Sequence, residues 1–341
     1  MTEKLPIILS QQTQRPTIQD NNLSQQTQTP KISSNYNNLN KNGDSKIETI
    51  AKIVYPDAIP CSSYFEMAFN FTDLGFKIPK TTLFELQSLL EVYINEIAEF
   101  GQNIMLRIDA YLGSDGSITI LDINSDFFNG WGTALAINRA FNISPGIPKD
   151  FNFPKFWDCS ENPDYLPELK TSVKELNLLG FDVQELTKKT IDYSKNNVYN
   201  YCRFQADSSK DNKMNLAYLK TMSLTKSKNV SIPNIYSVEN TPFDKIPKRF
   251  ILKSIDKSKT GLRNSVIFGN DCLGKKPMGL YNQGIYLAQQ WIDPYFVDGG
   301  RPTQLVFLTC GSAVATGYAQ IAKPGRKSIN DNSIIAPILI I

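Results

Sequence analysis

Residues 105–124, MLRIDAYLGSDGSITILDIN, constrain the fold of this chain more than any other stretch. Polar and apolar side chains alternate on either side of a Gly-Ser-Asp-Gly sequence, a pattern that predicts two strands joined by a turn. In the first strand Arg107, Asp109 and Tyr111 share one face, and apolar side chains share the other. The stretch therefore predicts a β-hairpin with one apolar face and one charged face.

The expected register of this hairpin follows from the length of its turn. With residues 113–116 as the loop, Leu112 lies opposite Ser117, and Arg107 lies opposite Asp122. Asp109 is then a diagonal neighbour of Asp122, about 7 Å away.

Asn124 is expected on the same face as these side chains, so Asp109, Asp122, Asn124 and Arg107 converge on one patch of sheet. Carboxylate and amide oxygens are the ligands of a hard cation that also binds phosphates. The alternative is a solvent-exposed, charged sheet face.

The composition excludes several classes of chemistry. The chain has no histidine, which excludes Ser-His-Asp and Cys-His catalysis and histidine-ligated metal sites. Its five cysteines are dispersed without a CxxC pair, which favours reduced thiols in a cytoplasmic protein. A net charge of +3 over 341 residues is too small to indicate binding to nucleic acid or to a membrane surface. No apolar run reaches the roughly 18 residues of a spanning helix. The apolar run near the N-terminus is too short for the core of a signal peptide.

The sequence divides into four predicted segments. Residues 1–45 form a disordered tail rich in Gln, Asn and Ser, in which LSQQTQRPTI is followed fourteen residues later by LSQQTQTPKI. This repeat is either a docking motif for a protein partner displayed twice or neutral variation in a tolerant tail. Residues 46–150 contain the hairpin, residues 151–208 form a small α/β piece, and residues 209–341 form the third folded part.

Two lysines of the third part have a context that suits phosphate. Lys213 begins the predicted helix 212–223, and Lys253 closes an apolar strand and opens the loop SIDKSKTG. A lysine beside such a loop can hold phosphate oxygens as a point charge while loop amides surround them. For Lys253 alone, a solvated strand end is the competing interpretation. Residues 304–309, 313–321 and 334–341 are predicted as further strands.

In their order, these features resemble the ATP-grasp superfamily. Its pattern contains a lysine-bearing helix, a lysine-bearing strand with a glycine-bearing loop, a hinge strand near Q-E-W/F-I, an arginine-containing strand pair and a closing R-x-D…E-x-N element. Here the closing element, Arg107-Ile108-Asp109…Asp122-Ile123-Asn124, comes first in the chain. A circular permutation reconciles that order, as in the glutathionylspermidine synthase-like branch, whose ending resembles SINDNSIIAPILII.

The resemblance implies an α+β ATP-grasp fold, in which two lobes clasp the nucleotide, preceded by a small α/β domain over residues 151–208. It implies ATP and Mg²⁺ as cofactors, and amide formation between a small-molecule carboxylate and an amine through an acyl phosphate. The implied metal ligands are Asp109, Asp122 and Asn124. The implied nucleotide-binding residues are Lys213, Lys253, Ser258, Gly261, Gln289, Gln290, Trp291 and Ile292.

The implied catalytic residues are Arg107, Arg301 and Arg326. Two positions depart from the family pattern, because Asp122 replaces the usual glutamate and Gln320 stands where an arginine is usual. That arginine stabilises the transition state of phosphoryl transfer, so its loss affects rate more than binding. The alternative function is therefore a catalytically impaired ATP-binding regulatory or partner protein. A further alternative is a β-rich binding module without nucleotide.

Overall fold

A computed structural model describes most of the chain after residue 74. The described residues are 75–97, 104–113, 116–125, 129–159, 165–186, 198–200, 212–223, 227–256, 266–267, 272–297, 301–322 and 334–340. Every described residue belongs to one compact unit. The predicted tail and its repeat lie outside the described residues, so they stay a prediction.

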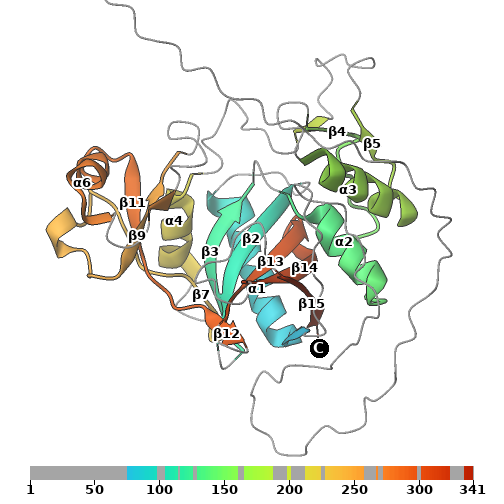
Figure 1. Ribbon diagram of the computed structural model, residues 1–341, viewed down its shortest axis with the longest axis horizontal. Coiled ribbons are helices and arrows are strands. Elements are labelled where there is room, and N and C mark those ends of the chain that lie inside the picture. The colour runs from blue at the N-terminus through green and yellow to red at the C-terminus, as the bar shows by residue number, and fades with distance from the viewer. Residues whose placement is uncertain are drawn as a thin grey trace, which may run out of the picture. The chain divides into compact units, whose positions relative to one another are not determined.

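An eight-stranded mixed sheet is the largest in the described part (Figure 1). Its order is β1-β15-β14-β13-β2-β3-β7, and β12 pairs with β13. The hairpin β2–β3 therefore joins strands that lie some 200 residues further along the sequence. The strands are β1 (Phe76–Ile78), β2 (Met105–Leu112), β3 (Ile118–Asn124), β7 (Val230–Ser231), β12 (Tyr295–Val297), β13 (Arg301–Cys310), β14 (Ala313–Ile321) and β15 (Ile334–Ile340).

The hairpin forms as predicted, but its register differs from the predicted one. Asp109 lies directly opposite Asp122, and Arg107 lies opposite Asn124. The prediction that Asp109 is only a diagonal neighbour of Asp122 is therefore wrong. One cause is the turn, which is one residue longer than expected, so that Gly113 N–H donates to Ser117 O over 2.7 Å.

The second cause is a β-bulge, because the pairing shifts between Asp109 and Ala110 and leaves Leu121 as the extra residue. The longer turn alone would turn Asp122 toward the core, since a one-residue slip moves every side chain to the other face. The bulge reverses that slip for the residues beyond it. The longer turn thus places Ile118 and Ile120 on the buried face, and the bulge keeps Asp122 on the face of Asp109.

One face of this sheet carries the larger of its two cores. Helix α1 (Lys80–Val92), the π-helical turn η1 (Tyr93–Ile97) and helix α4 (Met214–Ser223) supply apolar side chains to it. They meet Leu106, Ile108 and the isoleucines of β3. Burial of this face fixes which side of β2 carries Arg107 and Asp109.

The opposite face of the sheet is partly covered by helix α2 (Trp131–Ala140). Helix α3 (Leu166–Leu178) packs on α2, and the parallel three-stranded sheet β5-β4-β6 lies beside it (β4 Phe156–Asp158, β5 Gln184–Glu185, β6 Val198–Asn200). Contact between the helices is close at Gly132, where a Cβ atom would stand 2.6 Å from the Glu168 carbonyl oxygen.

A second, antiparallel sheet has the order β10-β9-β11-β8. One of its faces packs on helix α6 (Lys275–Asn282) and the 3-10 turn η4 (Phe243–Lys245) through Leu252 and Tyr286. Because side chains alternate along a strand, Lys253 and Ile251 project from the other face. The strands are β8 (Ile235–Tyr236), β9 (Phe250–Ser254), β10 (Val266–Ile267) and β11 (Tyr286–Gln290). No helix in the described part of the chain is long and apolar enough to cross a membrane.

Glu168 of α3 is a buried carboxyl group at the N-terminus of α2. Its Oε1 accepts from Thr133 N–H over 3.1 Å, and its Oε2 accepts from Ser172 Oγ over 3.2 Å. Burial raises the pKa of Glu168 from 4.5 to about 7, although these hydrogen bonds oppose the rise. Folding therefore favours the protonated carboxyl.

We expect the raised pKa of Glu168 to make the protein less stable as the pH rises. The stabilisation by the protonated carboxyl is complete below pH 4.5 and is lost as the pH rises through about 7. The loss is on the order of 3 kcal/mol. Glu168→Gln removes this dependence, so the difference in unfolding free energy between wild type and variant should change between pH 5 and pH 8.

Chemical denaturation at both pH values measures this difference. The control is Glu239→Gln, which changes an exposed glutamate. An equal difference at both pH values for the Glu168 variant would show that the carboxyl does not titrate in this range.

Candidate functional site

The two carboxylates of the hairpin lie side by side on the face of the sheet that α2 partly covers, in the part that α2 leaves open. Asp109 of β2 pairs with Asp122 of β3, and Asn124 Nδ2 donates to Asp109 Oδ2 over 3.3 Å. The three side chains predicted as metal ligands are thus brought together. The bulge at Leu121 is what places Asp122 in this group.

Arg107 holds the Asp109 carboxylate from one side. Its Nε and Nη2 donate to Asp109 Oδ1 over 3.1 and 3.0 Å. Its Nη1 donates to Asn129, to Oδ1 over 2.6 Å and to the backbone oxygen over 3.2 Å. Because Asn129 lies just before α2, this contact connects the site to that helix.

Gln304 of β13 completes the contacts of Asp109, because its Nε2 donates to Asp109 Oδ1 over 2.9 Å. Three N–H groups therefore point at Oδ1, whereas within the described residues Oδ2 accepts only the long bond from Asn124. A carboxylate oxygen has more than one acceptor position. Asp109 Oδ2 is consequently the atom best able to take a ligand.

Lys213 reaches the hairpin from the start of α4. Its Nζ lies 2.6 Å from Asp122 Oδ1, and it donates to Asn124 Oδ1 over 3.2 Å and to Ile123 O over 3.4 Å. The residue is only 4% exposed. An ammonium buried to this extent needs such partners, because desolvation without them is costly.

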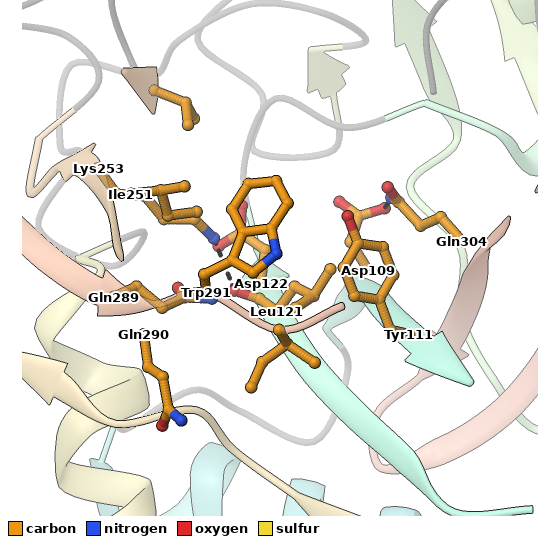
Figure 2. A pocket seen from close by; sticks show the side chains of 12 residues that line it. Asp109, Tyr111, Leu121, Asp122, Ile251, Lys253, Gln289, Gln290, Trp291 and Gln304 are labelled. Atoms are coloured by element: carbon orange, nitrogen blue, oxygen red, sulfur yellow. Dashed lines mark hydrogen bonds between the residues drawn. The ribbon is translucent and has the colours of Figure 1, made fainter. Parts of the chain in front are cut away.

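Lys253 reaches the same hairpin from the second sheet. Its Nζ donates to the carbonyl oxygen of the bulge residue Leu121 over 2.7 Å, and Figure 2 shows this side chain crossing from β9 to the hairpin. The predicted strand end is therefore not a solvated one, since Lys253 is 8% exposed. The two lysines enter the site from two different segments and meet neighbouring residues of β3.

A cavity of about 180 Å³ lies between the hairpin and the second sheet (Figure 2). Tyr111 and Trp291 are its aromatic walls, and burial, followed by the charges of Asp109 and Asp293, raises the pKa of Tyr111. The residues that line the cavity are Asp109, Tyr111, Leu121, Asp122, Ile251, Lys253, Val266, Gln289, Gln290, Trp291, Ile292 and Gln304.

The predicted hinge strand forms one wall of this cavity, but part of its backbone is already bonded. Gln290 N–H donates to Asn234 O over 2.8 Å, and Trp291 N–H donates to Arg249 O over 3.0 Å. Gln289 differs, because its side chain is 1% exposed and its Oε1 has no hydrogen-bond partner in the described part of the protein. An unpaired buried acceptor is costly, so it favours a ligand that donates to it.

The described charged side chains in and beside the cavity leave one net positive charge. Two carboxylates and one ammonium line the cavity, and Arg107 and Lys213 pair with the carboxylates beside it. Arg107, Lys213 and Lys253 bring three positive charges to the two carboxylates, Asp109 and Asp122. Burial strengthens the attraction for a negatively charged group, because the surrounding medium screens it less than water does. Polyphosphates are groups of this kind, because they carry several negative charges close together.

The residues present also fit Mg²⁺. No group of three or more His, Cys, Asp or Glu side chains suited to a metal ion occurs in the described part of the chain. Mg²⁺ does not need such a group, because it is usually held by one or two carboxylates together with phosphate oxygens and water. Asp109, with Asp122 across the strand pair, supplies carboxylates of that kind.

Four predicted residues have no described side chain. Ser258, Gly261 and Arg326 lie outside the described residues, and Arg301 is placed only as the first residue of β13, opposite Val297. Gln320 lies on β14 opposite Gln304, the residue that donates to Asp109. The roles of the three arginines and of the loop remain predictions.

Sequence reasoning missed Gln304, Asn129 and the Leu121 carbonyl group. Gln304 is one polar residue at the start of an apolar strand, and nothing in the sequence shows that β13 pairs with β2. The Leu121 carbonyl group accepts the hydrogen bond from Lys253 only because of the bulge. For Tyr111 a signal existed, since it shares a face with Asp109.

Comparisons with known proteins add little to this geometry. No protein-family model and no curated protein matches the chain. One solved structure that matches it is a "putative gamma-glutamylcysteine synthetase" from Methylobacillus flagellatus, with 11% sequence identity and a TM-score of 0.39, over 76% of this chain and 84% of that chain. Both the identity and the TM-score are too low to carry a conclusion about this chain.

Proposed function

We propose that this protein is an ATP-dependent carboxylate–amine ligase on a circularly permuted ATP-grasp fold. The observation that carries the proposal is a cavity lined by Asp109, Asp122 and Lys253, with Lys213 paired to Asp122 beside it. The two lysines are 91 to 144 residues away from the two carboxylates in the sequence. Their chemistry matches a polyphosphate together with a divalent cation.

In this proposal the phosphates bind between the hairpin and β9. Lys253, which now bonds to the Leu121 carbonyl group, lies close enough to the cavity to hold a phosphate oxygen. Asp109 would hold Mg²⁺, with the charge of Asp122 directly across the strand pair. When bound, the ion neutralises phosphate charge and orients the phosphate oxygens. Arg107, held by Asp109 and Asn129, presents a fixed positive charge at the end of the site.

The base would lie against the hinge strand. Gln289 Oε1, an acceptor without a described partner, suits the exocyclic amino group of adenine. Guanine presents a carbonyl oxygen at the corresponding ring position, which would repel it. The aromatic side chains of Trp291 and Tyr111 supply apolar walls for a planar ring.

The reaction requires no protein nucleophile, which agrees with a chain that lacks histidine. The substrate carboxylate attacks the γ-phosphorus of ATP, ADP leaves, and an acyl phosphate forms. An amine then attacks the acyl carbon, phosphate leaves, and the amide forms with loss of a proton from the nitrogen. The protein contributes positioning and charge neutralisation by Arg107 and the two lysines.

We expect ATP-dependent phosphate release in the presence of the correct acid and amine. A panel of amino acids, other small carboxylates and polyamines identifies the pair, with ADP and phosphate measured together. The double variant Asp109→Ala/Asn124→Ala should lose at least 100-fold in rate, because it removes a carboxylate from the cation site and the amide that contacts it.

The matched control is Asp244→Ala/Asn282→Ala. It changes the same residue types at exposed positions, in η4 and at the end of α6. It should keep the wild-type rate. Normal turnover in the Asp109/Asn124 double variant would exclude the assigned site.

A second candidate function is an ATP-binding regulatory or partner protein without turnover. Gln320 favours it, since it lies on β14 opposite Gln304 and beside the Asp109 contacts, where a positive charge would otherwise support phosphoryl transfer. Thermal stabilisation by Mg–ATP without ADP formation from any acid and amine pair would support this function. Absence of any stabilisation would contradict both functions.

A further inference from the structure

The ammonium group of Lys213 occupies a position that a metal ion could take. Three oxygens of β3 surround it: Asp122 Oδ1 at 2.6 Å, Asn124 Oδ1 at 3.2 Å and Ile123 O at 3.4 Å. Carboxylate, amide and backbone oxygens are also the ligands of hard divalent cations. Two of the three side chains predicted to bind metal thus already bind a cation of the protein itself.

The backbone around Lys213 is held in place, so the ammonium is tethered to this position. Lys213 N–H donates to Ile255 O over 3.4 Å, and Asn212 Oδ1 accepts from Met214 N–H over 2.9 Å at the start of α4. The helix that follows is anchored by Leu216 and Leu219, which are buried in the core. The side chain therefore extends from a fixed point into the oxygen cluster.

A divalent ion cannot share these oxygens with the ammonium. A double charge and a unit charge that share the same oxygens repel one another strongly, because a buried site screens charge less than water does. Lys213 would have to leave a site in which it is 4% exposed and paired with Asp122. Departure would cost Lys213 its ion pair and its two other oxygen partners.

The oxygen atom that can still bind a metal ion belongs to Asp109, on the other side of the cluster. Among the residues that the structure describes, Asp109 Oδ2 accepts only a 3.3 Å bond from Asn124, which Lys213 orients through its other atom, Oδ1. The position next to Asp109 also lines the cavity proposed for the nucleotide.

We propose that this site takes one divalent cation, on the Asp109 side, and that Lys213 supplies the second positive charge that the oxygen cluster would otherwise obtain from a second metal ion. The inference rests on the proposed binding of Mg–ATP. In it Asn124 serves to bind Lys213 and is not a metal ligand.

The test counts the metal ions bound with each nucleotide. Full-length protein is brought to equilibrium dialysis with MnCl₂ and a non-hydrolysable ATP analogue, and bound manganese and bound nucleotide are measured by atomic emission and absorbance. Wild type should retain one Mn²⁺ per nucleotide, and Lys213→Met should retain two, because the vacated oxygens accept a further ion. Electron paramagnetic resonance should show spin coupling between two manganese ions only in this variant.

Two further variants separate charge from side-chain loss. Lys213→Arg keeps the positive charge and should retain one ion. Lys220→Met should also retain one ion, because it removes a lysine of α4 that bonds to Ile232 O and Asn234. Circular dichroism confirms that each variant is folded. Where Lys213→Met does not fold, the wild-type and arginine ratios decide.

Two manganese ions per nucleotide in wild type, or one in folded Lys213→Met, would overturn the inference and leave the proposed function standing. Failure of wild type to bind the nucleotide at all would overturn both.

Discussion

The β-bulge at Leu121 is the constraint on which the site depends. It allows the isoleucines of β3 to enter the core while Asp122 faces the same side as Asp109. It also exposes the Leu121 carbonyl oxygen to Lys253 of the second sheet. Bulges are known to re-aim side chains beside functional sites, and this one does so for a carboxylate and a carbonyl group together.

The site is built by three segments that each contribute a hydrogen-bond donor to the hairpin. Lys213 comes from the start of α4, Lys253 comes from β9, and Gln304 comes from β13. None of these contacts is local in sequence, and each buried ammonium has oxygen partners. The core beneath β2 and β3 holds the two carboxylates in place, so packing on one face of the sheet positions the chemistry on the other.

Part of this arrangement could be predicted from the sequence. The alternation in residues 105–112 predicts the two faces of β2 correctly, and the bounds predicted for the strand over residues 313–321 match β14. The context of Lys253 and Lys213 predicts that both serve one site, and the structure brings both to β3. These features could be predicted because each is a local pattern or depends on a single side chain at the end of a strand or helix.

The rest depends on information that a period-two pattern does not contain. The wrong register of the hairpin came from one additional turn residue and one bulge, each of which shifts the pairing by one position. Gln304 and Asn129 contact the Asp109–Arg107 pair only because β13 and the start of α2 lie beside β2. Sequence periodicity predicts a strand's faces, but it does not identify the strand's neighbours.

The most direct test of the central claim is a crystal structure of the protein with Mn²⁺ and a non-hydrolysable ATP analogue, with diffraction recorded at the manganese absorption edge. We expect an anomalous peak at coordination distance from the Asp109 carboxylate. The phosphates should lie between the hairpin and Lys253, and the base should lie beside Gln289. A nucleotide bound elsewhere, with no manganese at Asp109, would contradict the assignment of this cavity as the site of ATP.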